Sequence, residues 1–321
     1  MLRHVLGYGI LACCIGAGTA YAQSYPERPI RLIVPYAAGG ASDIIARQFG
    51  RALGEELGQT VIVENKPGAA ASIGTAFVAR APSDGYTLLL ADTPHVINPA
   101  VLKTLPYDPI DDFSAVGTVG RTPLILLANP ELSLQNMQEM VEQVKAKPED
   151  FNIASGGTGT LTHMTGVLMQ EAIGLDMQHI PYNGTGQALG DVVAGHVDIM
   201  VSTAPGAIPL VKANSLRALA ITGVNRIDAL PEVPTFSEQG VSNFNEFTWY
   251  GLLAPAGLTA QVQDVLSRGI QKALGNAELN AAFKQAEVTP YMLSPDDFSE
   301  LLKKDLQKWQ AVVERHNIKA D

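Results

Sequence analysis

The chain has 321 residues, of which 46% are hydrophobic and 17% charged, so it can fold into more than one packed unit. Lysine and arginine number 22 against 32 aspartate and glutamate residues, which gives a net charge of −10. An acidic excess of this size argues against a broad surface for nucleic acid or for anionic membranes. An anionic ligand would therefore have to be held by local chemistry.

The first 22 residues form a segment of their own. Arg3 and His4 give a basic start, residues 5–20 are mostly apolar, and Ala20 and Ala22 place small residues at −3 and −1 before Gln23. This pattern predicts a secretory signal peptide over residues 1–22, cleaved after Ala22. The apolar run is too short to favour a membrane anchor instead.

Both cysteines, Cys13 and Cys14, lie in this amino-terminal segment. The mature chain would therefore enter an oxidising compartment without any disulfide. Catalysis by a thiol and metal sites built on cysteine are excluded for the mature chain.

After Gln23, short apolar runs alternate with amphipathic stretches, which is typical of an α/β fold. We expect strands over residues 30–34, 61–63 and 87–90, with helices over about 45–57 and 72–80 between them. Such a βαβαβ unit predicts a parallel sheet with right-handed connections.

A second series of elements follows, with strands expected over residues 124–127, 151–154, 177–182, 197–202 and 216–221 and a helix over about 134–145. The chain then returns through a strand over residues 248–253, and the remainder is expected to be helical. Ser294 followed by Pro295 and two acidic residues predicts the start of the last helix.

No linker rich in proline, serine or charge separates the two series, which favours two lobes joined by crossing strands. We expect the crossings near residues 116–123 and 234–249. Lobe 1 is therefore predicted to comprise residues 23–120 and 235–321, and lobe 2 residues 121–234. Each lobe should be a mostly parallel sheet flanked by helices.

Three glycine-rich turns each follow a strand and open a helix, at residues 35–43, 155–160 and 181–186. Glycines let backbone N–H groups approach a ligand, and the start of a helix adds about half a positive charge. None of these turns contains lysine or arginine, so the group they fit is a small anion such as a carboxylate. A single turn of this kind is often glycine-rich for geometry alone. Two of them, however, open with Pro-Tyr, one in each series, which indicates matching halves of one site.

Enzyme motifs are weak by comparison. The sequence has no G-x-S-x-G elbow, no phosphate-binding G-x-x-x-x-G-K-[ST] loop and no H-E-x-x-H, and its six histidines lack metal-ligand spacing. Ser155 and His163 could form a nucleophile–base pair, although His163 is better explained as a packing or capping residue of a helix. Asp43 could be a base, but a carboxylate at a helix start is more often structural. Trp249 and Tyr250 could stack on a ligand, but aromatic residues on a crossing strand usually belong to the core.

Residues 35–47, which read PYAAGGASDIIAR, resemble the start of the substrate-binding proteins of tripartite tricarboxylate transporters, also called Bug proteins. The resemblance continues in order through seven further motifs, at residues 65–69, 83–88, 95–99, 156–163, 181–186, 230–235 and 249–257. It therefore covers nearly the whole mature chain.

The resemblance implies a two-lobed, type II-like periplasmic binding protein that closes on a small organic carboxylate and delivers it to the membrane permease subunits of a tripartite transporter. It implies a monomer with no catalytic residue, no metal and no cofactor, and no nucleic-acid partner. Which carboxylate binds stays open among mono-, di- and tricarboxylates and aromatic acids.

The same resemblance implies the ligand contacts. Residues 36–43 and 182–187 would grip one carboxylate, and residues 93–95, 157–160 and 202–204 would shape the rest of the pocket. Ala38 stands where the family commonly has proline. The expected ligand-binding residues are Tyr36, Ala37, Gly40, Ala41, Ser42, Asp43, Thr93, His95, Gly157, Thr158, Thr160, Tyr182, Gly184, Thr185, Gly186 and Ser202.

Two alternatives to a transport receptor belong to other classes. One is an exported hydrolase that uses Ser155 and His163, which turnover of esters or amides would reveal. The other is a sensor subunit that presents its ligand to a membrane kinase, which mapping of membrane partners would reveal.

Overall fold

The computed structural model describes residues 25–242 and 244–319, so the predicted signal peptide and its cleavage site lie outside the described residues. Ten strands form one continuous sheet in the order β2-β1-β3-β9-β4-β7-β5-β6, with β8 and β10 also paired to β4. The first part of the sheet consists of β1 (Ile30–Val34), β2 (Val61–Asn65), β3 (Thr87–Asp92), β9 (Phe247–Pro255) and β10 (Thr289–Pro290). The second part consists of β5 (Asn152–Ser155), β6 (Gln178–Pro181), β7 (Ile199–Thr203) and β8 (Arg217–Ile221).

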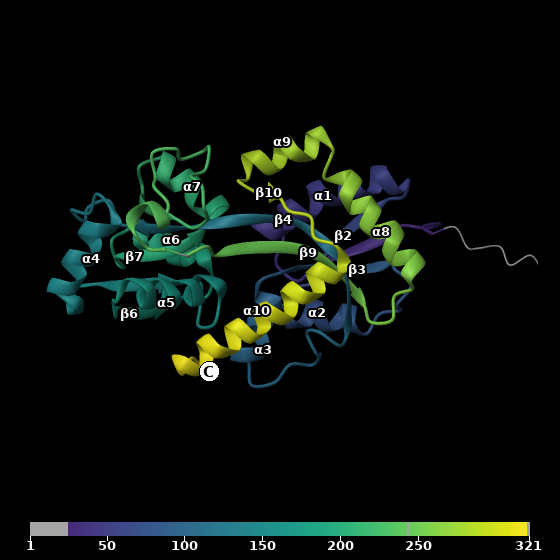
Figure 1. Cartoon of the computed structure of the whole chain (residues 1–321), viewed down its shortest axis with the longest axis horizontal. Helices are drawn as coiled ribbons and strands as arrows, with labels where there is room; N and C mark the ends of the chain where they lie inside the picture. Colours follow the sequence, from purple (N-terminus) through teal and green to yellow (C-terminus); the bar gives the residue numbers. More distant parts are fainter. Residues whose placement is uncertain (1–24, 243, 320–321) are drawn as a thin grey trace, which may run out of the picture.

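Strand β4 (Phe113–Ala128) joins the two parts because it runs through both. Its first half pairs with β9 and its second half with β7 and β8, all antiparallel. Figure 1 shows β4 and β9 crossing between a left and a right half of the molecule. The fold is therefore the α/β, two-lobed architecture that the sequence predicts. Strand β4 contains the first expected crossing, residues 116–123, whereas β9 shares only residues 247–249 with the second. The exact lobe boundaries stay a prediction.

The predicted βαβαβ unit is present with parallel pairing of β1 to both β2 and β3. Helices α1 (Ala41–Leu57), α8 (Ala260–Ala273) and α9 (Ala277–Gln285) cover one face of this half through Phe49, Ile270 and Phe283. Helices α2 (Ser72–Ala79), α3 (Pro94–Val101) and α10 (Pro295–Arg315) contribute to a different core cluster, which includes Val78, Ile97 and Trp309.

In the other half, α4 (Met137–Ala146) and α5 (Leu161–Ile173) belong to the same core cluster as α2, α3 and α10. One apolar core therefore continues from one half into the other. Helices α6 (Thr185–Val193) and α7 (Ala204–Lys212) pack on β4, β7 and β8 in a third cluster.

Two elements differ from the sequence-based expectation. Helix α3 was not predicted, because its eight residues contain an internal proline, Pro99. The two-residue strand β10 interrupts the stretch that was expected to be wholly helical, and it pairs Thr289 and Pro290 with Arg121 and Gly120. The start of α10 is as predicted: Ser294 Oγ accepts a hydrogen bond from the amide of Asp297, and Pro295 follows the cap.

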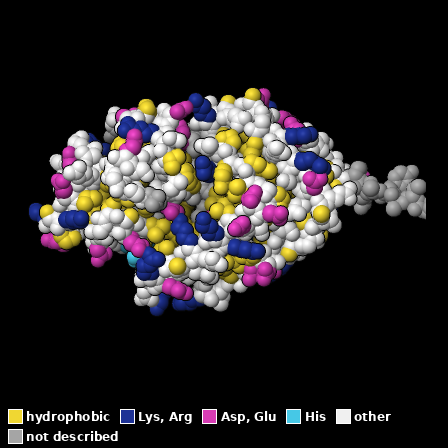
Figure 2. Space-filling model, in the orientation of Figure 1, with side chains coloured by type: hydrophobic (Ala, Val, Ile, Leu, Met, Phe, Trp, Pro, Cys, Tyr) yellow, Lys and Arg dark blue, Asp and Glu magenta, His cyan; other side chains and the backbone are white. Residues whose placement is uncertain are grey.

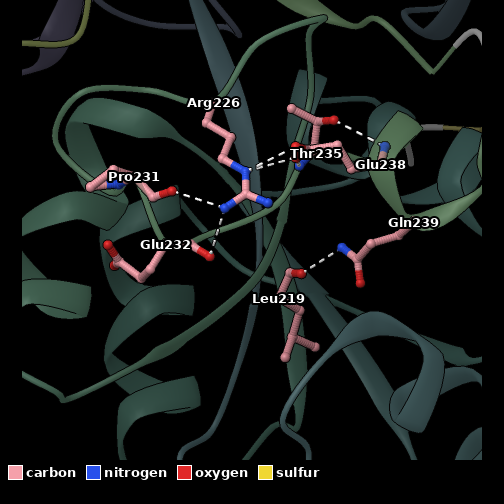
Figure 3. Close-up of polar contacts among 7 residues, drawn as sticks. All are labelled: Leu219, Arg226, Pro231, Glu232, Thr235, Glu238 and Gln239. Carbon is pink, nitrogen blue, oxygen red and sulfur yellow. Dashed lines mark hydrogen bonds and ion pairs between the residues drawn. The ribbon is translucent and has the colours of Figure 1, made fainter.

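The motif at residues 230–235 is held in place by hydrogen bonds and an ion pair that involve Arg226 and Glu238. Arg226 donates to the carbonyls of Pro231 and Glu232 and pairs with the carboxylate of Glu238 (Figure 3). Glu238 accepts from the amide of Thr235, whose hydroxyl accepts from the amide of Glu238 in return, which is a capping box. These contacts fix the segment that leads from β8 toward β9.

The surface carries charges of both signs. Figure 2 shows basic and acidic side chains interspersed over one face rather than gathered into a basic area. Within the described ranges no helix is long and apolar enough to cross a membrane. In the same residues, no group of three His, Cys, Asp or Glu side chains is placed to hold a metal ion.

Candidate functional site

The first Pro-Tyr turn connects β1 to α1 and is held by two polar side chains behind it. Asp43, which is buried, accepts hydrogen bonds from the amide of Gly39 at 2.9 Å, from Arg47 Nε at 3.1 Å and from Asn65 Nδ2 at 2.9 Å. Asn65 also donates to the carbonyl of Tyr36 at 3.1 Å. Burial alone would raise the pKa of Asp43, but the bonds from Arg47, Gly39 and Asn65 lower it. Asp43 is therefore a structural carboxylate that shapes the turn.

These contacts leave the start of α1 open toward a ligand. Gly40 is the N-cap residue with φ −79° and makes no side-chain cap, and the first amides of a helix have no partner within it. A Cβ built on Gly40 would meet only the carbonyl of Ala37, at 3.7 Å. Ala41 and Ser42 are the first residues of the helix. The turn thus has the geometry of an anion site without a charged side chain.

A buried aspartate that sequence reasoning missed lies directly behind this turn. Asp92 ends β3, and its Oδ1 accepts a hydrogen bond from the Tyr36 hydroxyl at 2.6 Å. Its Oδ2 accepts one from the Ser42 hydroxyl at 3.3 Å. Burial raises the pKa of Asp92 to about 7, even though the bonds from Tyr36 and Ser42 act in the opposite direction. The only sequence signal was a carboxylate at the end of an apolar strand.

The second Pro-Tyr turn connects β6 to α6 and mirrors the first. The Tyr182 hydroxyl donates to Asp191 Oδ2 at 2.8 Å, as the Tyr36 hydroxyl does to Asp92. Gly184 caps α6 with φ 132°, a conformation that favours glycine, and a Cβ on it would meet no atom within 4 Å. Both turns therefore present an uncapped helix start beside a tyrosine bound to an aspartate.

The middle turn, residues 156–160, lies against the second Pro-Tyr turn. A Cβ on Gly156 would lie 2.7 Å from Thr185 Oγ1, and one on Gly157 would lie 3.1 Å from the carbonyl of Tyr182. Thr160 caps α5, and its hydroxyl also donates to the carbonyl of Gly157 at 2.7 Å. The structure thus brings Gly157, Thr160, Tyr182 and Thr185 together in one half of the molecule, with Thr158 on the same turn.

Ser155 does not pair with His163. Its hydroxyl lies 2.6 Å from His179 Nε2 and also bonds to the backbone of Gly157. His163 instead accepts from the amide of Gly159 through Nδ1 at 3.0 Å, and its ring stacks on His179 with centroids 3.8 Å apart. Burial, assisted by His179, lowers the pKa of His163 to about 4. The hydrolase alternative is therefore wrong in its pairing, and this cluster supports the glycine turn.

Three residues that were expected to shape the rest of the pocket, Thr93, His95 and Ser202, are buried. Thr93 accepts from the amide of Trp249 at 3.2 Å and lines a cavity of about 140 Å³ between the crossing strands and α10. The ring of His95 stacks on Tyr107 and meets Phe113 edge to face, and its Nε2 bonds to the carbonyl of Pro109. Ser202 is fully buried on β7, and its hydroxyl has no hydrogen-bond partner among the described residues. The structure places these three beside the site rather than on the open turns.

The two halves meet near the middle turn. A Cβ on Gly159 would lie 2.2 Å from Val101 at the end of α3, so the two halves touch there. Glu171 of α5 also pairs with Arg315 at the end of α10 and lies 3.3 Å from His316. No hydrogen bond joins the two Pro-Tyr turns in the described part of the chain.

A two-lobed α/β fold that presents an uncapped, glycine-rich helix start from each half is the arrangement of a solute-binding receptor. A family model for the tripartite tricarboxylate transporter family receptor matches residues 45–318. BugT of Bordetella pertussis is 34% identical over 98% of this chain and 97% of its own length. The chain belongs to this receptor family.

Solved structures agree in fold. An R. palustris protein with adipate superposes with a TM-score of 0.83 and 26% identity, over 92% of this chain and 100% of its own. MatC from Rhodopseudomonas palustris with bound malate gives a TM-score of 0.77 and 28% identity, over 90% and 100%.

Proposed function

We propose that this chain is a non-enzymatic periplasmic receptor that binds a small organic carboxylate between its two lobes and delivers it to the permease subunits of a tripartite tricarboxylate-type transporter. The observation that carries the proposal is the pair of matching Pro-Tyr turns, one in each half, each with an uncapped helix start. The adipate and malate bound by similar proteins support a carboxylate as the ligand class. Export would be directed by the predicted signal peptide, which would then be cleaved after Ala22.

The ligand's carboxylate would be held by backbone amides and hydroxyls rather than by a basic side chain. The contacts proposed are those of the first turn, with Tyr36, Ala37, Gly40, Ala41 and Ser42, and those of the second half, with Gly157, Thr158, Thr160, Tyr182, Gly184, Thr185 and Gly186. Asp43 would act by shaping the first turn. A ligand that bridges both turns would favour a closed arrangement of the lobes.

A free carboxylate on the ligand should be obligatory. Thermal-shift screening with malate, adipate, citrate and benzoate identifies a bound acid, and calorimetry then compares that acid with its amide. We expect the amide to lose about 1.5–3 kcal/mol of binding free energy or more, because charge-assisted hydrogen bonds are lost. Equal affinity for acid and amide would contradict the proposed function, as would the absence of binding by every acid in the panel.

Delivery to a permease is tested separately. Uptake of the bound acid into cells that carry the tripartite permease should require the receptor, and receptor variants that fail to bind should not restore it. Binding of the acid without any effect on uptake would limit the chain to capture or sensing.

A further inference from the structure

Asp92 differs from Asp43, the other buried carboxylate behind the first turn, in having no cationic partner among the described residues. It is 7% exposed, and its two oxygens each accept one hydroxyl, from Tyr36 and from Ser42. Both hydroxyls belong to the turn that should hold the ligand's carboxylate. An anion behind an anion-binding turn opposes ligand binding, because two negative charges at short range repel each other.

Hydrogen bonds from Tyr36, Ser42 and the backbone amide of Asp92 itself favour its charged form, but they do not outweigh its burial. The titratable groups that face it are Tyr36 from the turn after β1 and Tyr250 from β9, and burial beside this carboxylate raises the pKa of both. No hydrogen bond or ion pair joins Asp92 to a lysine, arginine or histidine within the described residues. Without a cationic partner, binding a proton removes the free-energy cost of the buried charge. The pKa of about 7 places this protonation near neutral pH.

The direction of the hydrogen bond with Ser42 then depends on this proton. An ionised carboxylate only accepts, so the Ser42 hydroxyl must point its hydrogen at Asp92. A protonated Asp92 can donate from Oδ2 to Ser42 Oγ instead, which leaves the Ser42 hydrogen free to turn toward a ligand, while Oδ1 still accepts from Tyr36. One solvent proton moves to Asp92, and the Ser42 hydroxyl rotates.

We propose that binding of a carboxylate ligand is coupled to the uptake of one proton by Asp92, which acts as a positioning residue through Ser42. This inference rests on the proposed function. The second half lacks an equivalent device, because Asp191, the partner of Tyr182, is partly exposed and lies 3.6 Å from His196. The coupling is therefore a property of the first turn alone.

Calorimetry with malate and adipate as probes tests the coupling. The number of protons taken up is obtained from titrations in two buffers of different ionisation enthalpy. We expect close to one proton per bound molecule at about pH 8.5 and a small fraction at about pH 6, where Asp92 already carries its proton. The association constant should fall by up to about tenfold per pH unit above pH 7.

Asp92→Asn separates this role from a merely structural one. The asparagine amide can donate to Ser42 while its oxygen accepts from Tyr36, so it reproduces the protonated state permanently. Asp92→Asn should bind the same probe at about pH 8.5 as tightly as the wild type does at about pH 6, without proton uptake. The matched control is Asp198→Asn, since burial also raises the pKa of Asp198, which lies at the opposite end of β7 from the site. That variant should keep the wild-type proton uptake.

The outcomes distinguish this inference from the proposed function. A probe that binds with no proton uptake, or with uptake that survives in Asp92→Asn, overturns the coupling and leaves the receptor intact. If neither probe binds, NMR titration of the Asp92 carboxyl carbon in the free protein decides: titration near pH 7 retains the protonation step of the inference, and titration at an ordinary carboxyl pKa overturns it.

Discussion

At the residue scale, two aspartates 49 positions apart in the sequence have opposite roles behind one turn. Asp43 is surrounded by donors, one of them Arg47, so it stays ionised and braces the backbone. Asp92 is buried and receives two hydroxyls and its own backbone amide but no cation, so its charged form is disfavoured. The structural role of Asp43 was the favoured expectation from its place at a helix start. Asp92 was not foreseen, because its burial results from β9 and α1 packing around the end of β3.

The stability of Asp92→Asn relative to the wild type should depend on pH. The folded-state pKa of Asp92, about 7, lies above the ordinary value of 3.8, so the folded state binds the proton more tightly than the unfolded state. The wild type therefore loses stability as pH rises from about 4 to about 7, by up to about 4 kcal/mol, and the loss levels off above pH 7. Asp92→Asn escapes this loss.

Urea unfolding of both proteins at several pH values checks the expectation. The buried histidines titrate equally in the two proteins and cancel in the difference. Asp264→Asn on the exposed side of α8 serves as control and should change stability by less than about 1 kcal/mol at every pH. If the difference in free energy of unfolding between Asp92→Asn and the wild type stays constant from pH 4 to pH 8, burial does not raise the pKa of Asp92.

At the element scale, periodicity located most strands and helices, and the boundaries moved by only a few residues. The misses are short elements with weak local signals. Helix α3 contains Pro99, and β10 has two residues whose pairing is fixed by β4 rather than by their own sequence. The partner of Ser155 was also missed, because His179 comes from a neighbouring strand 24 positions away and only the parallel pairing of β5 with β6 brings them together.

A larger side chain at either helix start, at Gly40 or Gly184, should reduce ligand affinity much more than it reduces the stability of the fold. Gly40→Val places a side chain in open space at a normal φ, so we expect little loss of stability and a loss of affinity of at least tenfold, because the side chain covers the amides of α1. Gly184→Val should lose affinity too, and it should also cost about 1 kcal/mol or more in backbone strain at φ 132°.

Gly190→Val is the matched control, since Gly190 is an exposed glycine of α6, lies more than a turn beyond Gly184 and meets no atom within 4 Å of a built Cβ. Calorimetry with the acid found by screening measures affinity, and urea unfolding measures stability. Normal affinity in Gly40→Val would show that the first turn is a structural corner rather than a ligand contact.

At the scale of the whole molecule, the halves are joined by more than the crossing strands. One apolar core contains residues of α2, α3 and α10 together with residues of α4 and α5. At the far end of α10, Arg315 and His316 contact Glu171 of α5. Sequence reasoning predicted the two lobes and their crossing strands. It did not predict this contact, because nothing local marks residues 144 positions apart as partners.

The contact between Glu171 and α10 should bias the lobes toward the arrangement seen here. Hydrogen bonds from His316 and Arg315 lower the pKa of Glu171 against the opposing effect of burial, so the carboxylate is ionised at neutral pH. The pair is partly exposed, so it should contribute no more than about 1 kcal/mol, and less at high salt.

Glu171→Gln should therefore enlarge the radius of gyration of the free protein in small-angle scattering and weaken binding by no more than about fivefold. The form saturated with the bound acid should keep its size, because ligand contacts to both turns then hold the lobes. Glu55→Gln, which removes an ion pair within α1, should leave the free protein unchanged. Identical scattering of the two free variants would show that the halves are held by the apolar core and the crossing strands alone.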